Sequence, residues 1–191
     1  MRLDHASPLL NLIVLVGLSF LICAPGFAGD TTLISIGPRF GFSGKTPLMG
    51  KQQEHNFYLA DVAAVFGLPW SWPLGESPWT LETRLITSAG VLTATGQSGL
   101  MATVVPGLAL SGWDRLVSVD VGVGLGVFSR DKFGAQDFGG PVQIVATAGI
   151  VVNPIPHAYA GFRVQHFSDA GVYGPNSLGV DMYIVEAGYR F

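Results

Sequence analysis

The stretch Val117-Ser118-Val119-Asp120-Val121-Gly122-Val123-Gly124-Leu125 decides the fold, because branched apolar residues alternate strictly with small or polar ones. Side chains of a β-strand point alternately to the two faces of its sheet. One face of this strand is therefore broad and apolar, and the other carries serine, aspartate and glycine. The same alternation recurs over residues 34–42 and 142–152.

Turn signals divide the chain after residue 28 into eight such segments. The chain contains 26 glycines, and recurrent Val, Ile, Phe and Tyr are typical of strands. We expect strands at 31–42, 54–66, 78–90, 99–110, 114–127, 140–152, 156–168 and 181–191. Segments of this length cross a bilayer when tilted. The expected loops on one side of the membrane are 43–53, 91–98, 128–139 and 169–180, and the expected turns on the other are 67–77, 111–113 and 153–155.

Alternation alone fits a soluble barrel as well as a membrane barrel, and the composition of the polar face separates the two. The chain is 49% hydrophobic and 12% charged, has a mean hydropathy of +0.45 and contains three lysines, whereas a solvated exterior normally carries many Lys and Glu. Small glycines and mixed charges suit the narrow lumen of a membrane barrel, where opposite charges pair. The charged residues of the polar rows are Arg39, Glu82, Arg84, Asp120, Arg163 and Glu186.

Closure of the sheet meets the remaining requirement of a membrane, because it leaves no unpaired strand edge in hydrocarbon. We therefore expect an all-β fold, an eight-stranded antiparallel up-and-down transmembrane β-barrel over residues 29–191. It would be preceded by a cleavable signal peptide.

That signal peptide is expected at residues 1–28. An apolar run, 8–28, follows Arg2 and ends in Gly26-Phe27-Ala28, with small residues where signal peptidase cleaves. The alternative is a permanent transmembrane helix, which the length of the run almost allows. Pro25 and the strand pattern that follows immediately favour cleavage. The single cysteine, Cys23, lies in the run, so the barrel would contain no disulfide.

Several classes of function are disfavoured by what the sequence lacks. It has a net charge of −3 and no basic run, paired-cysteine pattern or glycine loop that would cradle phosphate. We therefore expect no nucleic-acid partner and no cofactor. The four histidines are scattered, so we also expect no metal site.

A serine, a histidine and an acid lie on the apolar rows of the last two segments. The apolar row 158–164 ends in His166 and Ser168, and Asp181 opens the corresponding row of the last segment. A serine hydroxyl is a poor nucleophile unless a base removes its proton and a third group orients that base. The Cα atoms of His166 and Ser168 should lie about 6.6 Å apart, a gap that an imidazole spans.

Two interpretations of these residues are open. A histidine and a serine near a strand end are often ordinary interfacial residues. Polar groups directed at lipid cost free energy, however, and three of them at one corner favour a serine esterase site. Glu186 competes with Asp181 as the acid, but its parity points it into the lumen.

The segment Gln165-His166-Phe167-Ser168-Asp169-Ala170-Gly171, followed by Pro175-Asn176 and an acidic residue opening the last strand, resembles the lipid A 3-O-deacylase (PagL) family. The resemblance implies an enzyme of the Gram-negative outer membrane whose substrate is lipid A of lipopolysaccharide. It implies hydrolysis, at the outer leaflet, of the ester-linked 3-hydroxyacyl chain at the 3 position. It also implies Ser168 as nucleophile, His166 as base and Asp181 as acid.

This chain departs from the family pattern at two positions. Asp169 stands where the family has Asn, whose amide is a candidate donor to the oxyanion. The backbone N–H groups of Ala170 and Gly171 are then the expected oxyanion donors. The family acid is Glu and lies one residue closer in sequence, so Asp181 is shorter and the loop must bring it nearer.

Other functions also fit the sequence. One is a non-enzymatic small outer-membrane barrel with a structural or adhesive role, in which Asp169 marks a lost activity. Another is an esterase that acts on phospholipid. Apolar outer faces contact membrane lipid or a second copy equally well, so a homodimer is open.

Overall fold

The computed structural model describes residues 31–44, 53–174 and 177–191, so the expected signal peptide lies outside the described residues. The long strands are β1 (Thr32–Phe42), β2 (Tyr58–Pro73), β3 (Trp79–Ala94), β4 (Gln97–Gly112), β5 (Val117–Phe128), β8 (Val142–Ile155), β9 (Ala158–Ser168) and β10 (Val180–Arg190). Two short strands, β6 (Lys132–Phe133) and β7 (Gln136–Asp137), form a ribbon of their own.

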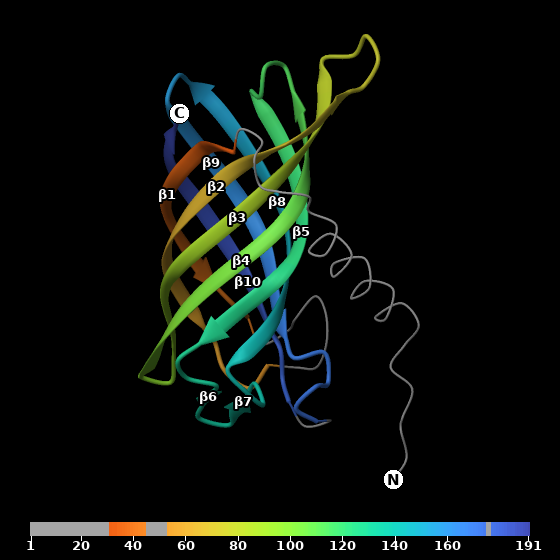
Figure 1. Cartoon of the computed structure of the whole chain (residues 1–191). Helices are drawn as coiled ribbons and strands as arrows, with labels where there is room; N and C mark the ends of the chain where they lie inside the picture. The colour runs from red at the N-terminus through yellow and green to blue at the C-terminus, as the bar shows by residue number, and fades with distance from the viewer. Residues whose placement is uncertain (1–30, 45–52, 175–176) are drawn as a thin grey trace.

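The eight long strands of the described chain close into a barrel in the order β1-β10-β9-β8-β5-β4-β3-β2 (Figure 1). Every neighbouring pair is antiparallel, and successive long strands are neighbours. The expected all-β, up-and-down barrel is confirmed. The β6–β7 ribbon and the β9–β10 connection lie at the end of the barrel opposite the C-terminus (Figure 1).

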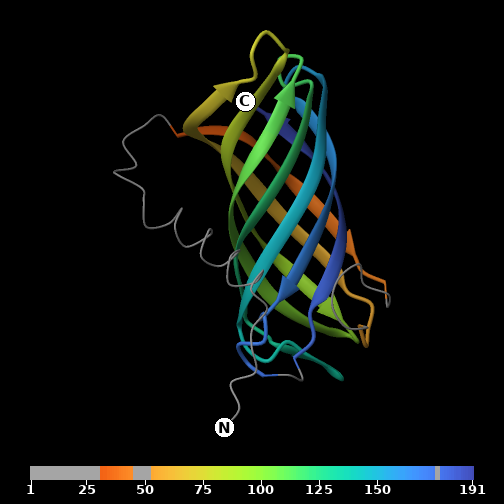
Figure 2. The ribbon, with the colours of Figure 1, turned by 90° about the vertical axis from the view of Figure 1, so that its right-hand side faces the viewer.

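Four connections differ from expectation. The turns expected at 111–113 and 153–155 are wrong in position, since β4 continues to Gly112 and β8 to Ile155. The expected loop at 91–98 is wrong, since β3 and β4 are joined by Thr95 and Gly96 alone, both with positive φ (52° and 73°). This backbone suits the right-handed twist of a two-residue hairpin. The expected turn at 67–77 is also wrong in its first half, because β2 continues to Pro73. The β2–β3 hairpin projects beyond the neighbouring strands (Figure 2).

The outer wall of the barrel is apolar. On β5, Val119 and Val121 are exposed, whereas Ser118 and Asp120 are buried in the lumen. The other strands repeat this arrangement, with Phe40, Val62, Leu100, Val104, Leu125, Val127, Ile150, Phe162 and Val185 among the exposed side chains. The apolar rows therefore face outward, as the scarcity of lysine predicts.

No helix within the residues that the structure describes is long and apolar enough to cross a bilayer.

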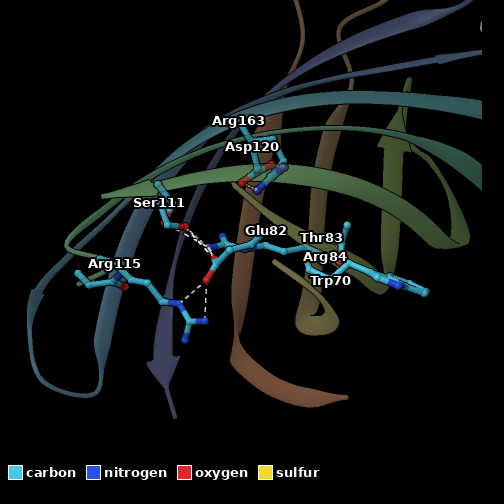
Figure 3. Close-up of polar contacts among 10 residues, drawn as sticks. Trp70, Glu82, Thr83, Arg84, Ser111, Arg115, Asp120 and Arg163 are labelled. Atoms are coloured by element: carbon cyan, nitrogen blue, oxygen red, sulfur yellow. Dashed lines mark hydrogen bonds and ion pairs between the residues drawn. The ribbon is translucent and has the colours of Figure 1, made fainter. Parts of the chain in front are cut away.

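The lumen contains charges that are paired with one another. Arg39 donates to both carboxylate oxygens of Asp61, at 2.8 and 2.5 Å. Arg163 donates to Asp120 at 2.6 and 3.1 Å and to Glu186 at 3.2 Å. A third cluster centres on Glu82, which accepts from Arg84, Ser111 and Arg115 (Figure 3). Bidentate pairing of this kind offsets much of the cost of removing the charges from water.

An aromatic cluster replaces the charges at the end where the β6–β7 ribbon lies. Phe57, Phe128, Phe133, Phe138 and Phe167 are buried there, with ring centroids 5.2–6.1 Å apart. Phe57 and the neighbouring Leu59 face inward together with Asp61. Their inward direction explains why residues 54–66 alternate less clearly in the sequence.

Candidate active site

The antiparallel register of β9 and β10 places His166 directly opposite Asp181. Nδ1 of His166 and Oδ1 of Asp181 form a hydrogen bond across the two strands. The aspartate side chain is 1% exposed, whereas the histidine side chain is 15% exposed. Because the carboxylate holds Nδ1, Nε2 is the ring nitrogen left for another partner.

Ser168 lies on the same face as His166, at the last position of β9. Its cross-strand neighbour on β8 is Ile144, and its side chain is half-buried. No hydrogen bond joins Ser168 to His166 in the described part of the chain. Contacts of this kind are often long without substrate and tighten when it binds. The structure thus brings the three predicted residues to one corner, with the histidine–aspartate contact formed and the serine–histidine contact open.

Two neighbours that the sequence did not single out fix the geometry of this corner. Phe167, between His166 and Ser168, points the other way and is buried against Phe128. Gly179 lies beside the imidazole, since a Cβ there would sit 3.1 Å from Cε1 of His166 and 2.6 Å from the Phe167 carbonyl oxygen. A glycine two residues before the acid was the only sequence signal for this close approach.

Asp169 is directed into its own loop. Its carboxylate accepts from the backbone N–H of Gly171 at 3.0 Å and of Tyr173 at 2.8 Å. Burial raises the pKa of Asp169, but the hydrogen bonds from Gly171, Ser177 and Tyr173 outweigh it and hold the pKa below its usual value. The group is therefore an ionised loop anchor.

This anchor involves one of the two expected oxyanion donors. The N–H of Gly171 is engaged by Asp169, so Ala170 is the candidate that remains. Ala170 has a φ of +53°, in the left-handed region that non-glycine residues rarely adopt. The backbone at Ala170, two residues after Ser168, is thus held in an unusual conformation.

Glu186 lies on the opposite side of the wall from the histidine. It is buried in the lumen, where Arg163 donates to it at 3.2 Å. The parity argument that assigned it to the lumen is confirmed.

The cavity found in the lumen of the described barrel is too small for a lipid substrate. A cavity lined by Arg84, Arg163 and Glu186, among others, has a volume of about 30 Å³, enough for roughly one water molecule. Within the described residues, no group of three or more His, Cys, Asp or Glu is placed to hold a metal ion.

The chain is similar to one family model and to solved structures. The model of the family "Lipid A 3-O-deacylase (PagL)" matches residues 59–190. A solved structure described as the crystal structure of the outer membrane enzyme PagL is 17% identical, covers 80% of this chain and 97% of its own, and superposes with a TM-score of 0.61. The backbone structure of the Yersinia pestis outer membrane protein Ail in a phospholipid bilayer nanodisc is 14% identical, covers 83% of this chain and 99% of its own, and has a TM-score of 0.44.

No curated protein matches the sequence. The solved PagL structure shares the fold, and the family model extends over more than half of the chain, from the start of β2 to the end of β10. The chain belongs to the lipid A 3-O-deacylase (PagL) family.

Proposed function

We propose that Ser168, His166 and Asp181 hydrolyse the ester that links a 3-hydroxyacyl chain to the 3 position of lipid A. Membership of the family assigns the reaction and the outer membrane to this chain. The observation that supports these residues most strongly is the His166–Asp181 pair on the lipid-facing wall, beside Ser168. An acyl ester at the edge of the bilayer would meet this corner without entering the barrel.

The chemistry follows from the roles of the three side chains. Nε2 of His166 accepts the proton of Ser168 as Oγ attacks the ester carbonyl carbon, and Asp181 stabilises the resulting imidazolium. The tetrahedral intermediate then expels the sugar 3-oxygen, which takes the proton from His166. Water attacks the acyl-serine in the same way and releases the 3-hydroxy fatty acid. Every step uses groups of this chain and water.

The oxyanion of the intermediate needs a donor close to the serine. We assign this role to the N–H of Ala170, because Asp169 occupies that of Gly171. The charge of Asp169 disfavours an oxyanion, but its two backbone donors partly neutralise it. This chain should therefore be active despite the Asn-to-Asp departure from the family.

Mass spectrometry of lipid A tests the proposal. The wild-type chain and Ser168→Ala would be expressed in a Gram-negative host whose lipid A carries the 3-O-acyl chain. Ser98→Ala is the matched control, because Ser98 is an exposed serine near the start of β4, at the same end of the barrel. We expect the wild type and Ser98→Ala to remove one 3-hydroxyacyl mass, and Ser168→Ala to leave lipid A intact while remaining folded.

Two results would contradict the proposal. Deacylation by folded Ser168→Ala would remove the serine from the mechanism. Intact lipid A in cells that contain folded wild-type protein would indicate a structural role, and lysophospholipid in the same extract would indicate phospholipid as the substrate.

A further inference from the structure

Two buried glutamines hold the start of β10, where the proposed acid lies. Oε1 of Gln53 accepts the backbone N–H of Asp181 at 2.8 Å, and Nε2 of Gln136 donates to the carbonyl oxygen of Gly179 at 2.8 Å. Gln53 is 2% exposed and Gln136 is completely buried. They lie 128 and 45 residues before Asp181, in two different connections.

Among the described residues, no strand pairs with this part of β10 on the β1 side. Pairing between β1 and β10 ends at Phe42 and Tyr183, so β1 does not reach Asp181. The N–H of Asp181 donates to Gln53, not to the opposite residue of β9. In an antiparallel pair, residues that exchange no backbone hydrogen bonds bring their side chains closer together. This orientation favours the contact between Asp181 and His166.

The two glutamine segments are also bonded to each other. Oε1 of Gln136 accepts the N–H of Glu54 at 2.9 Å, and the N–H of Ala135 donates to His55 at 3.1 Å. The N–H of Leu178 donates to the carbonyl of Asp137 at 2.8 Å. Parts of three connections thus form one hydrogen-bonded layer around the first residues of β10.

A buried amide is costly unless its donors and acceptors are used. Each of these amides uses its nitrogen and its oxygen, since Gln53 also donates to the Gly44 carbonyl at 2.8 Å. A buried apolar side chain would fill the same space without requiring partners. Unlike an apolar side chain, the amides form hydrogen bonds that fix the position of the backbone from Gly179 to Asp181.

We propose that Gln53 and Gln136 are positioning residues, which orient Asp181 towards His166 through the backbone of β10. This inference rests on the proposed function of the triad. It assigns no contact with substrate to either glutamine. It predicts that their loss lowers kcat and leaves KM nearly unchanged.

Substitution by Met removes both polar ends while keeping a similar volume. We expect Gln53→Met and Gln136→Met each to lower kcat by about tenfold to a hundredfold, the scale of a misplacement near 1 Å. Gln143→Met is the matched control. Gln143 is equally buried, but its amide donates to the carbonyls of Phe138 and Gly140 and forms no hydrogen bond with the described residues of β10. Its kcat should stay close to that of the wild type.

Substitution by Glu should affect the two glutamines differently, because Gln53 accepts a hydrogen bond from Asp181 whereas Gln136 donates one to Gly179. Glu at position 53 keeps the oxygen that accepts the Asp181 N–H, whereas ionised Glu at position 136 has no donor for the Gly179 carbonyl. Both changes place the same group at an equally buried site. We expect Gln53→Glu to recover most of the activity lost in Gln53→Met, and Gln136→Glu to recover none when assayed at alkaline pH.

A readout that does not depend on activity is the downfield proton NMR signal of a histidine N–H bonded to a carboxylate. It would be recorded in the Ser168→Ala background, in detergent micelles. We expect the signal in Ser168→Ala and with Gln143→Met added, and its loss when Gln53→Met or Gln136→Met is added. If the Met variants fail to fold, the Glu pair decides the question.

The outcomes separate this inference from the proposed function. If folded Gln53→Met and Gln136→Met retain both kcat and the downfield signal, the positioning role is wrong, while loss of activity in Ser168→Ala still supports the triad. If Ser168→Ala remains active, the proposed mechanism fails, and the NMR signal alone decides whether the glutamines hold Asp181. Equal behaviour of Gln53→Glu and Gln136→Glu would also overturn the positioning role.

Discussion

The lumen and the lipid-facing corner both contain buried carboxylates with cationic or imidazole partners, but their surroundings differ. In the lumen, Arg163 holds Asp120 and Glu186, and all three side chains are at most 5% exposed. At the corner, Asp181 is equally buried, yet its partner His166 is 15% exposed and shares its face with Ser168. Burial and charge therefore do not identify a reactive site. What distinguishes the corner is that its histidine is partly exposed and lies on the same face as Ser168, the proposed nucleophile.

The two carboxylates of β10 provide the strongest test of this difference. Asp181→Asn should lower kcat by about a thousandfold, because an amide neither stabilises the imidazolium nor fixes the correct tautomer. Glu186→Gln should leave activity per folded molecule nearly unchanged. Both would be measured as deacylation of lipid A in mixed micelles. Equal losses in the two variants would remove the distinction between corner and lumen.

Arg163→Met tests the lumen side. It leaves Asp120 and Glu186 without their shared cation, so the free energy of unfolding should fall by about 3–5 kcal/mol. Urea titration of the barrel in lipid vesicles measures this change. Activity of the folded fraction should remain, because the lumen cluster does not contact His166. Loss of activity at unchanged stability would assign a catalytic role to the lumen.

Gly179→Ala tests how closely the corner is packed. The new methyl group would meet the Phe167 carbonyl at 2.6 Å and the imidazole at 3.1 Å, so kcat should fall by about tenfold. Gly126→Ala on β5 is the control, since its nearest contacts are side-chain methyl groups that can shift. Equal kinetics of the two variants would show that the approach of Gly179 to His166 has no catalytic importance.

Asp169→Asn should raise kcat by about threefold, the scale of removing one partly neutralised charge near the oxyanion. The comparison with Asp181→Asn is direct, because the same chemical change should act in opposite directions. Deacylation kinetics of the two variants measure it. A lower kcat in Asp169→Asn would mean that the anionic anchor of the loop contributes more to catalysis than its charge costs the oxyanion.

The anchor also predicts a small pH effect confined to this loop. The pKa of Asp169 is lower in the folded chain than its usual value of about 3.9, so its stabilisation is present above that value. It is lost as the pH falls through the folded pKa. Hydrogen exchange of residues 170–174, relative to the intrinsic rate at each pH, should therefore accelerate at acidic pH in the wild type and much less in Asp169→Asn. The same acceleration in both would contradict the assignment.

Much of the fold follows from the sequence because a strand has a period of two residues. Parity alone separated Asp181 from Glu186, which lie five positions apart and face opposite sides of the wall. Predicting that the apolar rows face outward also required the composition, above all the small number of lysines. The roles of Ser168 and His166, and the signal peptide at 1–28, stay predictions.

Other features could not be predicted from local sequence patterns. The inward direction of Phe57 and Leu59 depends on aromatic residues of a distant connection that fill the same end of the barrel. The contacts of Gln53 with Asp181 span 128 positions, and no periodicity records them. The sequence predicts a longer loop around Thr95 and Gly96, because turn residues indicate where the chain bends but not how far the neighbouring strands extend.

The central claim is that Ser168 is a nucleophile activated by the His166–Asp181 pair, and covalent labelling tests it most directly. A fluorophosphonate would be added to the folded barrel in micelles, and the modified peptide would be located by mass spectrometry. We expect one phosphonyl group on Ser168, formed with loss of fluoride, and little labelling in His166→Ala or Asp181→Asn. Labelling of another serine, or none in a folded barrel that deacylates lipid A, would contradict it.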